Sequence, residues 1–164
     1  MTLNIDDKKR IVTEVAAIAA NAKSVVAAEY RGLTVEQLTA LRMGARKSGV
    51  YLRVVRNTLA RRAVADTEFA CLQDALVGPL LLAFSREEPG AAPKLISDFA
   101  KLNERLIIKA GAFNGKLMQP AEVDKLAKMP TRDQAISLLM AVMKAPVGKL
   151  ARTLAAVRDQ KQAA

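Results

Sequence analysis

The sequence predicts an α+β fold: a ferredoxin-like plait with a four-stranded sheet and a helical insert, followed by a long C-terminal helix. In the middle of the chain the patterns follow each other as βαβ, a helical insert at residues 57–77, and βαβ again, and two split βαβ units make this plait. Two strand segments, VVAA and LLLAF, are continuous apolar runs expected of central strands, whereas the other two carry Arg53 and Lys109, as edge strands do. A doubly wound parallel sheet is the competing arrangement.

Helix caps and a glycine delimit the elements of the first half. Asn4 followed by Asp7 favours a helix start, and the apolar positions after them have helical spacing. Gly32 ends the first strand, and Thr34 with Gln37 forms a capping box for the next helix. The expected elements are a helix with its apolar stripe over residues 11–22, a strand over residues 24–31, a helix ending near residue 49, and a strand over residues 50–56.

Similar signals delimit the second half. Asn57 is expected to cap a helix with Arg61 and Arg62 on its outer face. Pro89 favours the start of a later helix, and Asn114-Gly115 forms the turn after the last strand. The expected elements are this basic helix, a short helix over residues 68–77, a strand over residues 80–85, a helix through residue 103 carrying Leu95, Phe99 and Leu102 on one face, a strand over residues 106–113, and a short helix over residues 121–129.

A one-sided distribution of charge around the second strand predicts an anionic partner. The chain carries a net charge of +10 and has a pI near 10.1. Between residues 37 and 65 there are seven basic residues and no acidic one, whereas a solvated face usually mixes both signs. A merely basic surface is the alternative. The seven residues are Arg42, Arg46, Lys47, Arg53, Arg56, Arg61 and Arg62.

The composition argues against catalysis, metal binding and cofactors. The chain has no His and a single cysteine, Cys71, whose apolar helical surroundings predict a buried core thiol. The segment GAFNGK lacks the spacing of a phosphate-binding loop, and Leu117 stands where such a loop needs Ser or Thr, so the segment predicts a hairpin bend. The N-terminus lacks the apolar stretch of a signal peptide, and no apolar run approaches the roughly 18 residues of a membrane span. We therefore expect a soluble cytoplasmic protein that is not an enzyme.

The scarcity of aromatic residues indicates how a nucleic acid would be bound. Readers of single strands stack bases on aromatic side chains, but this chain has two Tyr, four Phe and no Trp. Arginine without aromatics favours contacts to the phosphates and the shape of a folded RNA or duplex, and no DNA-binding motif is visible. The residues expected to grip phosphates are Arg56, Arg61 and Arg62, with Arg31, Arg53, Lys8, Lys9 and Arg10 as further candidates on the same rim.

Residues 131–164 predict a helical tail that follows a globular domain of residues 1–130. Thr131 and Gln134 form a capping box, and an apolar triplet recurs eleven residues later, so both triplets fall on nearly the same face. Pro146 between them predicts a kink. A helix about 45 Å long exceeds what a closed core needs, so the stripe favours a projecting helix that docks other chains; a helix packed back on the globular domain is the alternative. The stripe comprises Ile136, Leu139, Met143, Val147, Leu150 and Leu154.

Five segments, in order along the chain, resemble one known family. They are YRGLTVEQLTALR, GVYLRVVRNTLARRAV, LVGPLLLAFS, PGAAPKLISDFAK and KLARTLAAVRDQK, and together they resemble the bacterial large-subunit ribosomal protein ten family, the stalk-base proteins. The resemblance covers essentially the whole chain, and R-N-T-L followed by A-R-R-A is its most specific part. By motif, the residues that match the basic strand-to-helix segment of the family are Arg56, Asn57, Arg61 and Arg62, and those that match its R-G-x-T turn are Arg31, Gly32 and Thr34.

The resemblance implies a non-enzymatic adaptor in the large ribosomal subunit. In the family, the globular domain binds the GTPase-associated region of large-subunit ribosomal RNA beside ribosomal protein eleven. The C-terminal helix carries two or more dimers of the acidic stalk protein seven/twelve, which recruit translational GTPases. The family complex also binds its own messenger RNA and represses translation. The implied arrangement is an RNA-binding domain at residues 1–130 and a tail at residues 131–164 that binds the dimers.

Two rival functions come from other classes. The tail carries six cations against two acids, so it could lie on a membrane surface as a basic amphipathic helix, although it lacks Trp and Phe. An enzyme with a pocket invisible in the sequence is the second rival. A non-ribosomal RNA-binding adaptor is a further alternative to the ribosomal function.

Overall fold

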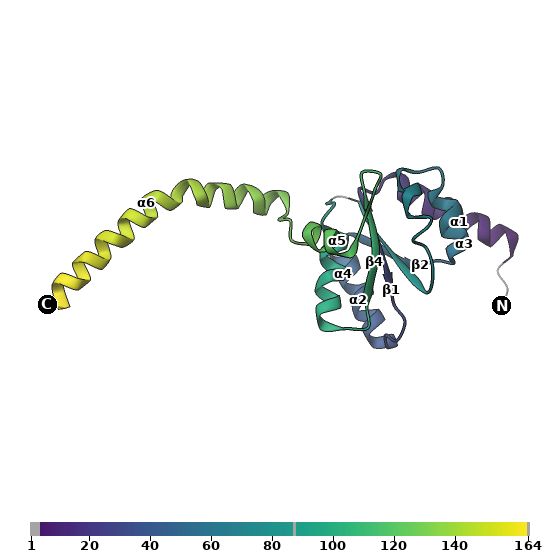
Figure 1. Cartoon of the computed structure of the whole chain (residues 1–164), viewed down its shortest axis with the longest axis horizontal. Coiled ribbons are helices and arrows are strands. Elements are labelled where there is room, and N and C mark those ends of the chain that lie inside the picture. Colours follow the sequence, from purple (N-terminus) through teal and green to yellow (C-terminus); the bar gives the residue numbers. More distant parts are fainter. Residues whose placement is uncertain (1–3, 87, 164) are drawn as a thin grey trace. The chain divides into compact units, whose positions relative to one another are not determined.

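The chain divides into two compact units, Met1–Met129 and Pro130–Ala164, called here the head and the tail. The computed structural model describes residues 4–86 and 88–163. The head is an antiparallel sheet with helices on both faces, and the tail is one helix (Figure 1). In chain order the elements are α1 (Ile5–Ala20), β1 (Ser24–Glu29), α2 (Val35–Lys47), β2 (Val50–Val54), α3 (Asn57–Val64), the 3₁₀ helix η1 (Glu68–Leu72), β3 (Leu80–Ser85), α4 (Ala91–Leu102), β4 (Ile107–Phe113), β5 (Lys116–Met118), α5 (Pro120–Ala127) and α6 (Arg132–Ala163).

The sheet has the strand order β2-β3-β1-β4-β5, which confirms the predicted plait with β1 and β3 at its centre. Each neighbouring pair is antiparallel. The predicted four strands become five because β4 turns at Asn114 and Gly115 and pairs with β5. Both turn residues have positive φ, 48° and 73°, as tight hairpin turns require. The fourth strand is therefore not an edge, contrary to the sequence-based expectation.

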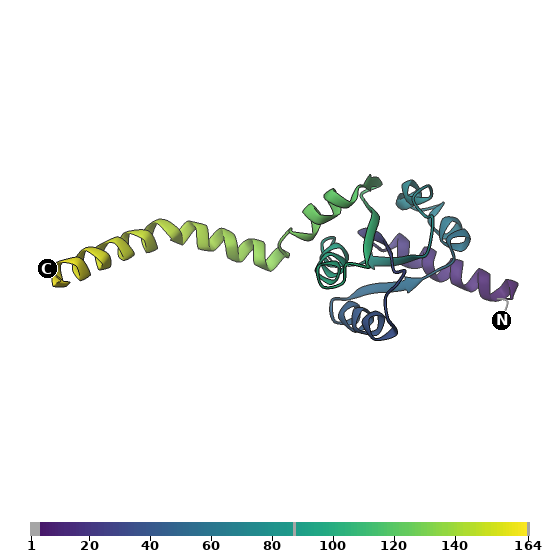
Figure 2. The ribbon, with the colours of Figure 1, turned by 60° about the horizontal axis from the view of Figure 1, so that its bottom comes forward.

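Two apolar cores lie on the two faces of the sheet, because successive strand residues point to opposite sides. On one face α1, α3 and η1 pack with Phe69 and Phe84, and on the other α2, α4 and α5 pack with Ile96 and Val123. Figure 2 shows helices on both sides of the strands. At Gly111 of β4, an added Cβ would lie 2.8 Å from a methyl group of Val123, so glycine permits this close packing of α5.

Several local predictions are confirmed and others are corrected. The Thr34–Gln37 capping box is present, with hydrogen bonds of 3.0 and 3.3 Å. Asn4 stands at the N-cap of α1 but makes no side-chain cap hydrogen bond. In α4 the predicted Leu95 and Phe99 pack against the core around the buried Ile96, whereas Leu102, at the helix end, is 82% exposed. The expected helix over residues 68–77 is instead a 3₁₀ helix, Glu68–Leu72, with a kink at Phe69.

The tail is one helix whose apolar stripe is exposed. The Thr131–Gln134 capping box is present, and α6 continues through Pro146 with a curved ribbon (Figures 1 and 2). Exposed fractions in the stripe run from 47% for Ile136 to 73% for Met143. Within the part of the chain that the structure describes, no helix has the length and apolarity needed to cross a membrane.

Candidate nucleic-acid interface

One end of the sheet gathers several of the predicted basic residues. Because β1 and β2 both run antiparallel to β3, their C-terminal ends lie at the same end of the sheet, next to the start of β3. Tyr30 and Arg31 follow β1 there, and Arg56 and Asn57 follow β2. A shallow groove of about 430 Å³ opens at this end, lined by Tyr30, Arg56 and Asn57 with the start of β3. The structure thus brings Tyr30 and Arg56, which lie 26 positions apart in the sequence, to one groove.

Asn57 has a different local role from the one predicted. The N-cap of α3 is Arg56, whose carbonyl accepts the backbone N–H groups of Leu59 and Ala60 at 2.9 Å each. Asn57 is the first helical residue, and its amide nitrogen donates to the carbonyl of Gly78 at 2.8 Å. Asn57 therefore ties α3 to the loop before β3. The exposed Arg56 side chain makes no hydrogen bond or ion pair with the described residues, so its charge faces solvent.

The neighbouring arginines of α3 are not equivalent. Arg61 donates from Nε to the carbonyl of Gln73 at 3.1 Å and from Nη2 to the carbonyl of Leu76 at 2.9 Å. These bonds fasten the end of the helical insert to α3. Arg62 is also exposed, but within the described chain its side chain has no such partner. Sequence reasoning grouped the two residues; the structure gives Arg61 an internal role and leaves Arg62 available.

A second groove, between α1 and α3, collects three more of the predicted cations. Its volume is about 470 Å³, and Lys8, Lys9 and Arg62 lie around it. None of the described residues that line it is acidic. The sequence analysis expected Lys8 and Lys9 on the same rim as Arg62, and the packing of α1 on α3 brings the three residues to one groove.

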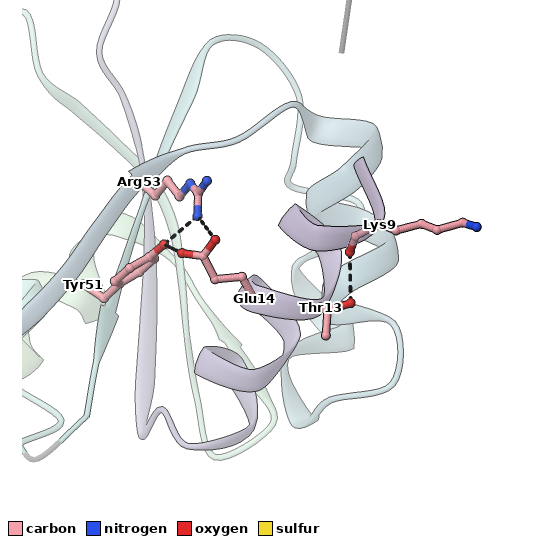
Figure 3. A network of polar contacts seen from close by, with 5 residues as sticks. All are labelled: Lys9, Thr13, Glu14, Tyr51 and Arg53. Atoms are coloured by element: carbon pink, nitrogen blue, oxygen red, sulfur yellow. Dashed lines mark hydrogen bonds and ion pairs between the residues drawn. The ribbon is translucent and has the colours of Figure 1, made fainter. Parts of the chain in front are cut away.

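Arg53 is engaged within the head. Its Nη1 lies 2.5 Å from a carboxylate oxygen of Glu14 in α1 and donates to the Tyr51 hydroxyl at 2.9 Å, and that hydroxyl donates to Glu14 at 2.8 Å (Figure 3). The hydrogen bonds from Arg53 and then from Tyr51 hold the pKa of Glu14 below its usual value, while burial raises the pKa of Tyr51. Glu14 therefore offsets the charge of Arg53. Lys9 points away from this cluster in Figure 3.

Sequence reasoning missed three contributors to this region. Tyr30 lines the same groove as Arg56, and its place directly before Arg31 was the available signal. Arg105 donates to the carbonyl of Gly32 at 2.9 Å and so supports the R-G-x-T turn from another element, which no local pattern indicates. Glu14 is the third. In the described residues, no group of three or more His, Cys, Asp or Glu side chains is placed to hold a metal ion.

The tail presents more apolar surface than the predicted stripe. The two triplets repeat at eleven residues on one face, and all six side chains are exposed. Leu138 and Val142 are also 63% and 64% exposed, and at 100° per residue they fall on a different side of the helix from Ile136. The half of α6 before Pro146 is thus apolar over a wider arc than the half after it.

Comparison with known proteins gives consistent matches over both units. Residues 3–101 match the family model of ribosomal protein L10, and residues 129–164 match the model of the ribosomal protein uL10 C-terminal region. The chain is 62% identical to the large ribosomal subunit protein uL10 of Thioalkalivibrio sulfidiphilus, with 99% of each chain covered. It is 59% identical to the protein of the same name from Methylococcus capsulatus, with 100% of each covered. For that of Aeromonas salmonicida the identity is 60%, over 100% of this chain and 99% of the relative.

Proposed function

The chain belongs to the ribosomal protein uL10 family, and on this premise we propose that it forms the base of the large-subunit stalk. It is a structural ribosomal protein of the cytoplasm and not an enzyme. In the proposal, the head binds the GTPase-associated region of large-subunit ribosomal RNA beside ribosomal protein eleven. The tail anchors dimers of the acidic stalk protein seven/twelve, which bring translational GTPases to the ribosome. We also propose its own messenger RNA as a ligand, as the family resemblance implies.

The observation that carries the RNA proposal is the set of cations around α3 whose side chains have no partner among the described residues. Arg56 stands at the start of α3, and Arg62 lies about 9 Å further along the helix at 1.5 Å per residue. Lys8 and Lys9 join Arg62 from α1. Exposed cations bind the phosphates of a polynucleotide and release its counterions. Arg31 adds to the same end of the sheet, whereas Arg53, Arg61 and Asn57 support the surface from within.

The tail proposal is supported by the six exposed side chains of the stripe. Burying three of them in one docked dimer contributes roughly 5–9 kcal/mol, at about 1.5–3 kcal/mol for each side chain. Association and ordering cost part of this gain, so micromolar to nanomolar affinity is expected for each site. The net charge of the whole chain, +10, also favours an acidic partner.

A salt titration tests the RNA proposal. The full chain should bind an RNA fragment of the GTPase-associated region, and the logarithm of the affinity should fall linearly with the logarithm of the salt concentration. Replacing Lys8, Lys9 and Arg62 by Gln should weaken binding and flatten that slope, by about 0.7–0.9 for each phosphate that is no longer neutralised. Replacing Lys94, Lys101 and Lys128, which line a groove formed with α4 and α5, is the charge-matched control. An equal effect in both triple variants would remove the α1–α3 surface from the interface.

A further inference from the structure

The groove between α1 and α3 has an apolar lining that phosphate binding alone does not require. Besides its three cations, the groove is lined by Ile5, Val12 and Leu59. Ile5 is 66% exposed, while Leu59 belongs to the core and is 7% exposed. A purely electrostatic surface for phosphates needs no aliphatic floor, and an exposed aliphatic side chain in a groove gains free energy when a ligand covers it.

The dimensions and chemistry of the groove define its occupant. Its volume of about 470 Å³ lies within the range of small-ligand sites, about 300–1,000 Å³. The occupant must present an apolar surface to the floor and negative charge to the rim. Thr13 also lines the groove, and because its hydroxyl donates to the Lys9 carbonyl at 2.9 Å, its oxygen can still accept a hydrogen bond. An unstacked nucleotide meets each requirement: its flat base covers the apolar floor, its flanking phosphates face the cations, and an amino group at the base edge can donate to Thr13.

We infer that this groove holds one unpaired nucleotide of the bound RNA, with its base against Ile5, Val12 and Leu59 and its phosphates against Lys8, Lys9 and Arg62. The inference rests on the proposed RNA binding and names a subsite within it. Arg56, the N-cap of α3, lies about 9 Å before Arg62 along the axis of the same helix, so both residues belong to the proposed RNA-binding region. RNA that displays unpaired bases is recognised by taking such bases out of the stack, so this subsite would favour a loop, bulge or junction over a regular duplex.

The buried floor, small size and basic rim of the groove favour a nucleotide over a membrane or a partner helix. A membrane would need apolar side chains that protrude together, whereas Leu59 is buried at the floor. A partner helix would need a long apolar stripe opposite it, whereas this groove is small and has cations on its rim. A nucleotide needs no more room than the groove offers.

The test combines one protein variant with single-base deletions in the RNA. Ile5→Ser removes apolar lining without changing charge, and Leu102→Ser, at an 82% exposed position of α4, is the matched control. Affinities are measured for the intact RNA fragment and for a panel in which each nucleotide in turn is abasic. With the unaltered chain, one unpaired position should lower the affinity about fivefold or more when its base is removed, because the aliphatic side chains of the groove then lose the surface that covers them. In Ile5→Ser the intact RNA should bind about fivefold more weakly, the same base removal should have no further effect, and the salt slope should be unchanged.

Two results would overturn the inference. One is that every base removal has the same effect in Ile5→Ser as in the unaltered chain. The other is that Ile5→Ser weakens binding to phosphatidylglycerol vesicles and not to RNA. In either case a persistent salt-dependent affinity for RNA would leave the proposed function standing, whereas the absence of any RNA binding would remove both. Val12→Thr, which keeps the shape of the side chain, repeats the test if Ile5→Ser unfolds at a lower temperature.

Discussion

Adjacent arginines on α3 should have separable effects on stability and RNA binding. Arg61→Ala removes two hydrogen bonds from a charged donor to the carbonyls of Gln73 and Leu76. Net contributions of such bonds are about 1.5–3 kcal/mol each, and because Arg61 is exposed, we discount the pair to about 1–2 kcal/mol in total. Since Leu76 is buried, its carbonyl cannot easily exchange the missing donor for water. Arg61→Ala should therefore lower the free energy of unfolding.

Arg62→Ala should leave the free energy of unfolding within about 0.5 kcal/mol of the original, as for an exposed side chain without internal partners. It should instead reduce the slope of RNA affinity against salt by about 0.7–0.9, because one phosphate fewer is neutralised by the protein. Lys94→Ala, on the opposite face of the sheet, makes the same change in charge and serves as the control.

Urea unfolding followed by tyrosine fluorescence reports on the head, because both tyrosines, Tyr30 and Tyr51, belong to it. Filter binding of the RNA fragment over a series of salt concentrations gives the slopes. The assignment would be refuted if Arg62→Ala destabilised the head while Arg61→Ala did not. It would also be refuted if Arg62→Ala and Lys94→Ala gave the same slope.

Three further predictions concern other parts of the chain. Glu14→Gln should free Arg53 from its ion pair and raise RNA affinity at low salt, as filter binding would show. Because the pKa of Glu14 is lowered in the folded state, this carboxylate stabilises the head by at most about 1 kcal/mol above its unfolded-state pKa, and the stabilisation is lost as pH falls through the folded-state pKa. Urea unfolding at several pH values should therefore show this loss in the original chain and not in Glu14→Gln. Gly111→Ala should cost about 1–3 kcal/mol of unfolding free energy, because the added methyl group would lie 2.8 Å from Val123; an unchanged urea midpoint would contradict this packing. Ending the chain after Ala145 should leave one stalk dimer bound instead of two, counted by native mass spectrometry, and two retained dimers would disprove one dimer per triplet.

Signals that act within a few residues were sufficient to predict much of the fold. The capping boxes at Thr34 and Thr131, the Asn114-Gly115 turn and the apolar runs of β1 and β3 all depend on near neighbours in the sequence. Strand β5 escaped prediction because three residues, KLM, carry no period that could be recognised, and its stability comes from pairing with β4.

The candidate site was less predictable because several of its basic side chains are paired with groups that lie far away in the sequence. The window of residues 37–65 contains no acid, yet Glu14 reaches Arg53 from α1, 39 positions earlier in the numbering. Arg61 finds its partners in the insert, whose path no local pattern indicates. Conversely, Lys8 and Lys9 came together with Arg62 because α1 packs on α3, a packing that the sequence pattern does not specify.

Pro146 divides the hydrogen-bond ladder of α6. A proline has no N–H, so the carbonyl of Val142 lacks the backbone hydrogen bond that residue 146 would otherwise donate to it. Helix formation propagates through consecutive rungs, and a missing rung weakens the cooperativity between the two sides. The helical segment after Pro146 can therefore unfold and refold while the segment before it stays helical. Amide hydrogen exchange should accordingly show two distinct rates along α6.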